Sequence, residues 1–190
     1  IALPAIMGNE GAGVVEAVGA DVTYVKPGDH VITCLSAFCG HCDQCLTGHM
    51  SLCQEPELQR PADQPSRLAN GDENLAQFLN LSSFAEYMLV HEHAIVKVRE
   101  DMPLDRAALI GCGVTTGVGA VIHTAKVEPG STVAVIGCGG VGLSAINGAA
   151  IAGAARIIAV DTLASKLDLA RKFGATDVVN AAEVDAVGEI

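Results

Sequence analysis

The stretch Val133–Gly142 reads VAVIGCGGVG, and it decides the fold of the second half of the chain. A short β-branched run leads into G-x-G-x-x-G, with Gly137, Gly139 and Gly142 at the glycine positions. The first glycine allows a tight turn, the second a close approach of the backbone to a pyrophosphate, and the third close packing of the following helix on the strand. Asp161 closes the next predicted strand, 24 positions after Gly137, where a carboxylate can reach a ribose hydroxyl. The sequence therefore predicts a dinucleotide site.

The phosphates of such a ligand would meet free N–H groups at the start of the predicted helix, around Gly140 and Val141. An S-adenosylmethionine site on a similar fold and a tight turn without a ligand are the alternatives. The acid at position 161 favours NAD over NADP, because it would repel a 2′-phosphate. Cys138, at a variable position of the motif, is interpreted as a small apolar filler.

Alternating elements surround this motif. Strands are expected at 131–136, 156–160 and from 177, and helices at 140–152 and 164–173, the last one ending at Gly174. This alternation indicates βαβ units and a parallel sheet.

The first part of the chain has a different pattern. Strand composition is found in 11–34, interrupted by a turn at Val25–Asp29, and again in 84–98, whereas 36–75 has neither helical nor strand period. Such a long irregular stretch needs something other than a hydrophobic core to fix it. The boundary between an irregular β domain (1–113) and an α/β domain (114–190) is therefore expected near residue 113.

Composition excludes some classes of protein. The net charge of −11 argues against a nucleic-acid surface. Without a run of 18 apolar residues free of charges and glycine clusters, no membrane span is expected. The chain has no initiator Met and begins as if within a strand, so we expect an internal piece of a longer protein.

Four cysteines, Cys39, Cys42, Cys45 and Cys53, follow the spacing C-x2-C-x2-C-x7-C within the irregular stretch. Four close thiolates form the tetrahedral shell that zinc accepts in a structural site, and the metal would fix a lobe at about 36–54. Disulfides are an alternative, although no secretion signal is visible. An iron–sulfur cluster is another, although its usual spacing ends in C-P and Cys53 precedes a Gln. His41 and His49 are interpreted as exposed loop histidines, because four sulfurs complete the shell.

A four-cysteine lobe before a dinucleotide motif resembles the zinc-dependent medium-chain alcohol dehydrogenases. The likeness covers almost the whole chain, in stretches such as GAGVVEAVG, VKPGDHV, CGHCDQC, SSFAEY and IGCGVTTGVGA, and is poor only from Glu55 to Asn74. CLSAFCGHC and LIGCGVTTGVGA further resemble the nicotinoprotein and NDMA-dependent branch. The resemblance implies α/β plus irregular β structure, with a GroES-like domain followed by the first half of a Rossmann domain.

The resemblance also implies site residues. The family's catalytic zinc is held by a Cys about twenty residues before position 9, by the His of a GHE motif and by the Cys of a GCG motif, and a Glu beside the His can approach the metal. The Cys of the GCG motif is Cys112 here, the Glu is Glu10, and Asn9 stands at the His position. The first Cys falls outside this sequence. Thr116 matches a residue that contacts the nicotinamide region, and Lys166 matches a basic residue near the adenosine ribose. Leu35 and Leu79 match positions lining the substrate pocket, with core packing as the alternative.

The implied function is transfer of a hydride between a primary alcohol, or an aldehyde adduct, and NAD, in a cytoplasmic homo-oligomer. A zinc ion in the open site would lower the pKa of the alcohol. Because an amide oxygen is a poor zinc ligand compared with an imidazole nitrogen, Asn9 predicts a weakened or absent catalytic zinc beside an intact structural one. A non-catalytic dinucleotide- and zinc-binding protein and a zinc-independent reductase of the same superfamily are the alternatives.

Overall fold

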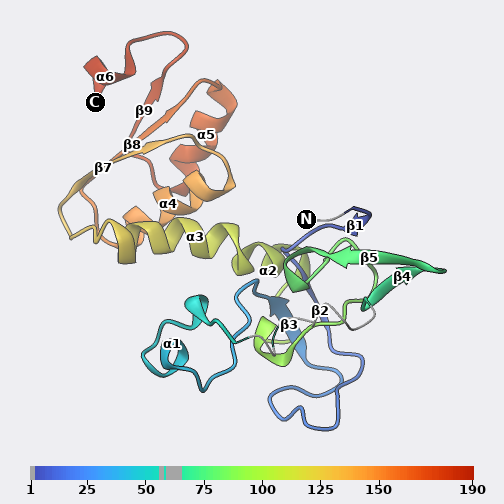
Figure 1. The fold of residues 1–190 in the computed structure, drawn as a ribbon. Helices are drawn as coiled ribbons and strands as arrows, with labels where there is room; N and C mark the ends of the chain where they lie inside the picture. Colours follow the sequence, from blue (N-terminus) through green and yellow to red (C-terminus); the bar gives the residue numbers. More distant parts are fainter. Residues whose placement is uncertain (1–2, 56–57, 59–65) are drawn as a thin grey trace. The chain divides into compact units, whose positions relative to one another are not determined.

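The computed structural model describes residues 3–55, 58 and 66–190. The chain divides into two compact units, Ile1–Cys112 and Gly113–Ile190, and each is described by itself. The sequence had placed this boundary after residue 113. Most helices and strands of both units are labelled in Figure 1.

The second unit is built around a parallel sheet of three strands. The strands are β7 (Thr132–Ile136), β8 (Arg156–Asp161) and β9 (Asp177–Asn180), in the order β7-β8-β9. The helices α4 (Gly140–Ile151) and α5 (Ala164–Phe173) make the two crossovers and pack together (Figure 1). The predicted parallel βαβ organisation is confirmed, with strand and helix bounds within one residue of those expected.

Both faces of this sheet carry buried apolar side chains. The larger cluster joins Ile157 and Ala159 of β8 to Ile146 of α4 and Leu167 of α5. On the opposite face Ile158, Val160 and Val179 form a second cluster, packed against Ala186 of α6 (Ala186–Glu189). Successive β8 residues point to opposite faces, so a strand buried on both sides has to be a continuous apolar run. Each fully buried Ile contributes about 1.5–3 kcal/mol relative to exposure.

Two further helical segments belong to this unit. They are α3 (Gly113–Gly119) and a π-helical turn at Ala120–Thr124. Gly117 of α3 lies so close to α4 that a Cβ there would overlap the carbonyl of Val141. α3 therefore packs directly on the first turn of α4.

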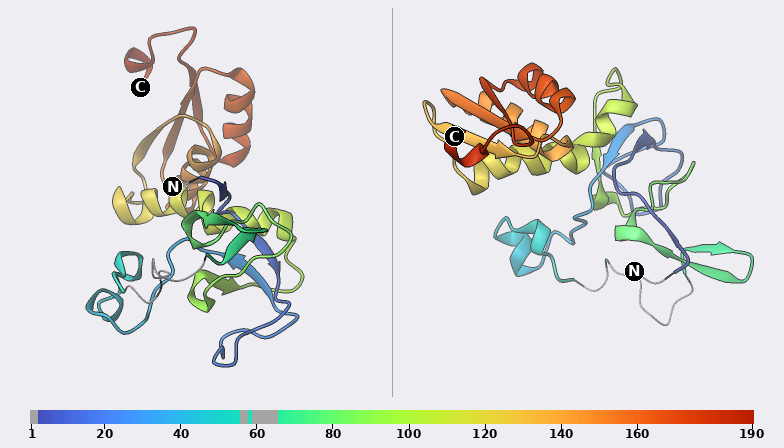
Figure 2. Two further views of the ribbon diagram at one scale, coloured as in Figure 1. Left: turned by 45° about the vertical axis from the view of Figure 1, so that its right-hand side comes forward. Right: turned by 90° about the horizontal axis from the view of Figure 1, so that it is seen from above.

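The first unit contains two small sheets (Figure 2). One has the order β2-β3-β6, from Ala12–Val14, His30–Thr33 and Ile95–Lys97, and is antiparallel throughout. The other has the order β1-β5-β4, from Ala5–Ile6, Glu73–Gln77 and Leu68–Asn70. Helical segments complete the unit: α1 (Asp43–Leu46), α2 (Leu104–Ala107), and 3-10 turns at Met50–Leu52, Phe78–Asn80, Glu92–Ala94 and Ala108–Gly111.

The structure corrects three sequence expectations here. The stretch 36–75 is not irregular to its end, because β4 and β5 form a hairpin across Gly71 and Asp72, with Gly71 at φ 60°. The Asn70-Gly71 pair is a hairpin signal that outweighs weak periodicity. Residues 56–57 and 59–65 of the poorly matching segment lie outside the described residues.

The other two corrections concern strand length. Only 95–97 of the predicted strand region 84–98 forms a strand, and Phe84, Tyr87 and Leu89 are exposed. Strand composition alone does not decide where a strand forms, because continuous pairing with a neighbouring strand is also required. β2 likewise ends at Val14, although Val15 and Val18 have strand composition.

Among the described residues, no single helix combines the length and the apolar composition needed to cross a membrane.

Candidate functional site

The four predicted zinc-binding cysteines come together. Their Sγ atoms all lie within 4.8 Å of one another, with Cys42–Cys45 at 3.5 Å, Cys39–Cys45 at 3.8 Å and Cys42–Cys53 at 3.9 Å. Zn–S bonds of about 2.3 Å would place the sulfurs of a tetrahedron about 3.8 Å apart. None of the seven cysteines forms a disulfide. The geometry therefore fits a closed zinc site with four thiolate ligands.

The backbone around these cysteines prepares them for a cation. N–H groups of Cys39 and Cys42 donate to the sulfurs of Cys53 and Cys39, at 3.4 and 3.3 Å. A hydrogen bond from the backbone N–H of Cys45 lowers the pKa of Cys42 to about 6. Burial, together with the surrounding sulfurs, raises the pKa of Cys45 to about 12. Mutual repulsion of thiolates opposes full ionisation, and a divalent cation at the centre removes that opposition.

The two histidines of the lobe are both exposed, as expected. His49 Nδ1 lies 3.2 Å from the Thr47 hydroxyl. His41 also lies near the metal-type donors Cys39 and Glu55, within the same 4.8 Å limit. This second group shares Cys39 with the four-cysteine site, where four thiolates already suffice for a tetrahedral zinc shell.

The glycine-rich loop of the second unit has the geometry that a dinucleotide requires. Gly137 has φ 92°, and a Cβ at Gly142 would overlap the Gly137 carbonyl. A Cβ at Gly139 or Gly140 would meet nothing within 4 Å. No side chain caps the N-terminus of α4, whose N-cap is Gly139. Gly139, Gly140 and Val141 are exposed, so the uncapped start of α4 is accessible to a ligand, which suits a pyrophosphate.

Asp161 lies at the end of β8 beside this loop. One carboxylate oxygen accepts from Cys138 N–H at 2.8 Å, and the other accepts from Leu163 N–H at 3.0 Å. These hydrogen bonds lower the pKa of Asp161, and the one from Cys138 has the largest effect. Asp161 is therefore a hydrogen-bond acceptor at neutral pH. Lys166 Nζ lies 3.6 Å from the same carboxylate. Each carboxylate oxygen can accept two hydrogen bonds, which leaves capacity for ribose hydroxyls.

The other residues near the loop have clear positions. Cys138 is almost fully buried, and burial followed by the charge of Asp161 raises the pKa of its thiol, in agreement with the filler interpretation. Thr116 is exposed on α3, next to the Gly117 that contacts Val141. Thr116 thus lies close to the N-terminal turn of α4.

In the first unit, the loop that carries Asn9 and Glu10 connects β1 to β2. Its N-terminal side is bonded to the segment Ser82–Phe84: Ser82 Oγ donates to Ile6 O at 2.7 Å, Phe84 N–H to Met7 O at 3.0 Å and Ser83 N–H to Gly8 O at 3.0 Å. Gly8 has φ 95°, and a Cβ there would come within 2.5 Å of Ser83 Oγ. Sequence reasoning did not identify these serines, and only the SSFAEY likeness pointed to the segment.

The three residues implied at the catalytic metal are placed as follows. Glu10 is exposed, while Asn9 and Cys112 are partly buried. Among the described residues, none of the close groups of three metal-type donors includes Glu10 or Cys112. A thiolate and a carboxylate are both zinc-ligand types, so Cys112 and Glu10 fit the metal chemically, whereas Asn9 does not.

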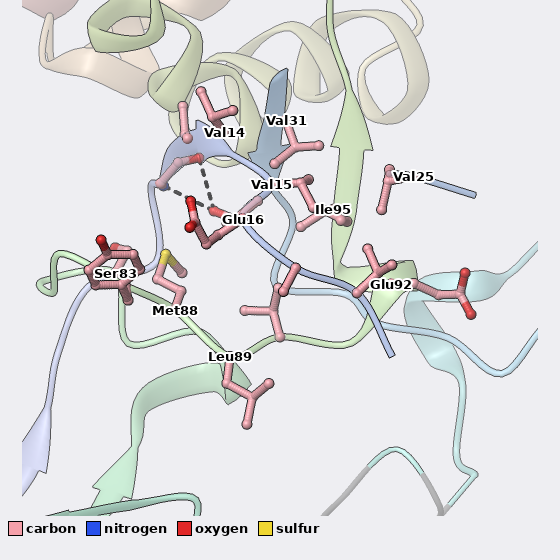
Figure 3. A pocket seen from close by; sticks show the side chains of 18 of the residues that line it. Val14, Val15, Glu16, Val25, Val31, Ser83, Met88, Leu89, Glu92 and Ile95 are labelled. Carbon is pink, nitrogen blue, oxygen red and sulfur yellow. Dashed lines mark hydrogen bonds between the residues drawn. The ribbon is translucent and has the colours of Figure 1, made fainter. Parts of the chain in front are cut away.

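A cavity of about 450 Å³ lies in the first unit, beside the end of the β1–β2 loop at Gly11 (Figure 3). Valines and an isoleucine of the small core, including Val15, Val25, Val31 and Ile95, form its walls. The lining does not include Leu35 or Leu79, which are 40% and 42% exposed. The predicted role of these two leucines in substrate binding stays a prediction.

Comparison with known proteins agrees with this architecture. Residues 1–100 match the alcohol dehydrogenase GroES-like domain, and residues 140–190 match the zinc-binding dehydrogenase domain. The chain is 47% identical over 187 residues to the probable S-(hydroxymethyl)glutathione dehydrogenase 1 of Schizosaccharomyces pombe, covering 96% of this chain and 50% of that protein. It is 46% identical over 182 residues to the class-3 alcohol dehydrogenase of Pisum sativum, covering 93% and 48%.

Solved structures show the same relationship. An alcohol dehydrogenase zinc-binding domain protein from Burkholderia ambifaria superposes with a TM-score of 0.89 at 44% identity, covering 99% of this chain and 52% of that chain. Benzyl alcohol dehydrogenase from Acinetobacter calcoaceticus gives 0.84 at 40%, covering 99% and 52%. The chain belongs to the zinc-dependent alcohol dehydrogenase family, and it spans about half the length of the curated relatives it matches.

Proposed function

We propose that the protein containing this chain transfers a hydride between a primary alcohol and NAD, with a weakened catalytic zinc site. The observation that carries the redox part is the open N-terminus of α4 beside the ionised Asp161. Two of the relatives are named for S-(hydroxymethyl)glutathione and benzyl alcohol, and both compounds carry a CH2OH group. These names support a primary alcohol or an aldehyde adduct as the substrate class.

The residues of the second unit would hold the cofactor. The N–H groups of Gly140 and Val141 would bind the pyrophosphate, where the helix dipole favours an anion. Asp161 accepts from the adenosine ribose, with Lys166 beside it, and this negative charge disfavours a 2′-phosphate. Thr116, close to the first turn of α4, would contact the nicotinamide end. These contacts hold the hydride acceptor in a fixed orientation, which is the protein's main contribution to a reaction that the cofactor carries out.

The first unit would supply part of the metal site. Cys112 would bind zinc as a thiolate, and Glu10 would add a carboxylate. Zinc, when bound, acts as a Lewis acid that lowers the pKa of an alcohol group. Asn9 offers only an amide where the family has an imidazole, so we expect the zinc in this site to be weakly held or lost.

The test compares the full-length protein with its Asn9→His variant. Zinc content per chain and NADH formation with a series of primary alcohols are measured for both. We expect about one zinc per chain before the substitution and about two after it, with a large gain in activity. Two zincs per chain in the unsubstituted protein would contradict the weakened site. Inactivity of both proteins, with NAD still bound, would instead support the non-catalytic dinucleotide-binding role.

A further inference from the structure

Thr33 is a buried polar residue at the C-terminal end of β3, with only 4% of its surface exposed. Its side chain and backbone bind the loop that carries Glu10. The hydroxyl accepts from Gly11 N–H at 3.0 Å and donates to Asn9 O at 3.1 Å, with Gly11 O as an alternative acceptor at 3.2 Å. Thr33 N–H also donates to Gly11 O at 2.9 Å. The residues on both sides of Glu10 are therefore fixed by one threonine.

The carbonyl group of the same threonine faces the segment that carries Cys112. Gly111 lies so close that a Cβ at this position would overlap the Thr33 carbonyl oxygen. Any other residue at 111 would push the two backbones apart. Cys112 follows directly in the chain, so its position depends on this contact.

We propose that Thr33 is a positioning residue that sets the separation between Glu10 and Cys112. The proposal rests on the proposed function, which assigns these two residues to the catalytic metal. Thr33 connects segments that are 22 and 78 positions away in the sequence, and it is rigidly held itself because β3 pairs with β2 on one side and β6 on the other. Two donors on separate loops bind one ion well only when the protein fixes their separation in advance.

Removal of the hydroxyl has a specific consequence. Thr33→Val keeps the shape of the side chain but leaves the buried Gly11 N–H without its hydroxyl acceptor and Asn9 O without its hydroxyl donor. We therefore expect the Asn9–Glu10 part of the loop to shift, although the backbone bond from Thr33 N–H to Gly11 O remains. Thr33→Ser retains the hydroxyl. Loss of a hydrogen bond that orients a metal ligand typically lowers metal affinity by about 10–100-fold. We expect Thr33→Val to lower metal affinity by about 10-fold, the lower end of this range, because the hydrogen bonds reach Glu10 only through its neighbours. Thr33→Ser should lower metal affinity little.

The experiment uses the full-length protein with the Asn9→His substitution, in which the second metal site is expected to be occupied. The four-cysteine site is first filled with zinc, and Co²⁺ is titrated into the second site while its absorption spectrum is recorded. Thr33→Val, Thr33→Ser and the control Ser66→Ala are compared. Ser66 also has a hydroxyl that donates to a carbonyl, Leu75 O, and accepts from an N–H, Leu68 N, but it lies just before β4.

The expected result is a weaker Co²⁺ affinity and an altered spectrum in Thr33→Val only, with zinc content of the four-cysteine site unchanged. If Thr33→Val does not fold, Thr33→Ala repeats the test; it removes both the hydroxyl and the γ-methyl group, and Thr33→Ser, which lacks only the methyl group, is then its matched comparison. Unchanged Co²⁺ affinity in the hydroxyl-free variant, or an equal loss in Thr33→Ser, would overturn the role of Thr33 alone. If the parent Asn9→His protein binds no Co²⁺ at a second site, the proposed catalytic metal site fails and the role of Thr33 fails with it.

Discussion

The four-cysteine lobe and the Rossmann sheet are stabilised by different means. No residue of α1 or of the Met50–Leu52 turn is buried, whereas the four sulfurs lie close together at the centre of the lobe. The sheet of the second unit has two apolar clusters, with Ile146 and Ile158 fully buried. We therefore expect the lobe to depend on a bound ion and the sheet to depend on burial of apolar surface. The two regions should respond to opposite perturbations.

Removal of the structural metal should have the largest effect. Cys42→Ser removes one of four ligands from a type of site whose zinc affinity contributes about 10–16 kcal/mol in zinc-finger peptides. We expect the amides of 39–53 to lose protection from hydrogen exchange, while those of β7, β8 and β9 keep theirs. Hydrogen exchange read by mass spectrometry, with zinc content, checks this. His49→Ala, in the same lobe, is the control, and a lobe that stays protected in Cys42→Ser would show that zinc does not organise it.

A core truncation should produce the converse result. Ile158 is fully buried between β7 and β9, so Ile158→Ala should lower the free energy of unfolding of the second unit by about 2–5 kcal/mol. Urea denaturation followed by circular dichroism measures this loss, and zinc content should not change. Ile151→Ala, at a position 67% exposed, is the matched control and should stay within about 0.5 kcal/mol. Equal losses in the two variants would show that the sheet is not stabilised by this core.

This contrast also explains what the sequence could predict. The Rossmann elements and the four-cysteine site were identified because their signals are local. In both cases the deciding residues lie within a few tens of positions of one another along the chain, as Gly137 and Asp161 do, or Cys39 and Cys53. Chain geometry over such distances is restricted by turn and helix chemistry. The helix Ala164–Phe173 was even predicted to its bounds, because Gly174 ends it in the left-handed conformation with φ 117°.

The first unit was less predictable because its contacts are distant. Ser82 bonds to Ile6 across 76 positions, and Thr33 bonds to Asn9 across 24. Serine and threonine are common in strands and turns, so nothing in their local sequence distinguishes a residue that fixes a remote loop. The strand region 84–98 was overestimated for the same reason, since pairing partners and not composition decide where a strand forms. Asn9 could be singled out only through the family likeness.

Two glycines of the dinucleotide loop are expected to have different roles in the second unit, one in stability and one in NAD binding. A methyl group at Gly142 would overlap the Gly137 carbonyl, so Gly142→Ala should destabilise the unit by about 1–3 kcal/mol. A methyl group at Gly139 meets open space, and φ there is −81°, which an Ala adopts readily. Gly139→Ala should therefore leave stability unchanged and weaken NAD binding, because it fills the space for the pyrophosphate. Thermal unfolding and NAD titration separate the two effects, and a destabilised Gly139→Ala protein would contradict this division of roles.

The smallest expected effect concerns the ion pair of Asp29 in the first unit. Asp29 Oδ1 lies 2.7 Å from Lys97 Nζ, and Oδ2 accepts from Lys26 N–H at 3.1 Å. The hydrogen bond with Lys97, followed by that from Lys26, lowers the pKa of Asp29 below its usual 3.8. In the window between the lowered native value and 3.8, the unfolded chain binds more protons than the native one, so stability rises with pH there.

The stabilisation from Asp29 is thus fully present above 3.8 and is lost as the pH falls through the native pKa. Asp29→Asn should remove this part of the acid dependence, which urea midpoints measured from neutral pH down to about pH 3 would show. Asp177→Asn is the control, because its partner Arg156 belongs to the second unit and its loss should leave the acid response of the first unit intact. An unchanged acid response of the first unit in Asp29→Asn would mean that its carboxylate contributes nothing to folding.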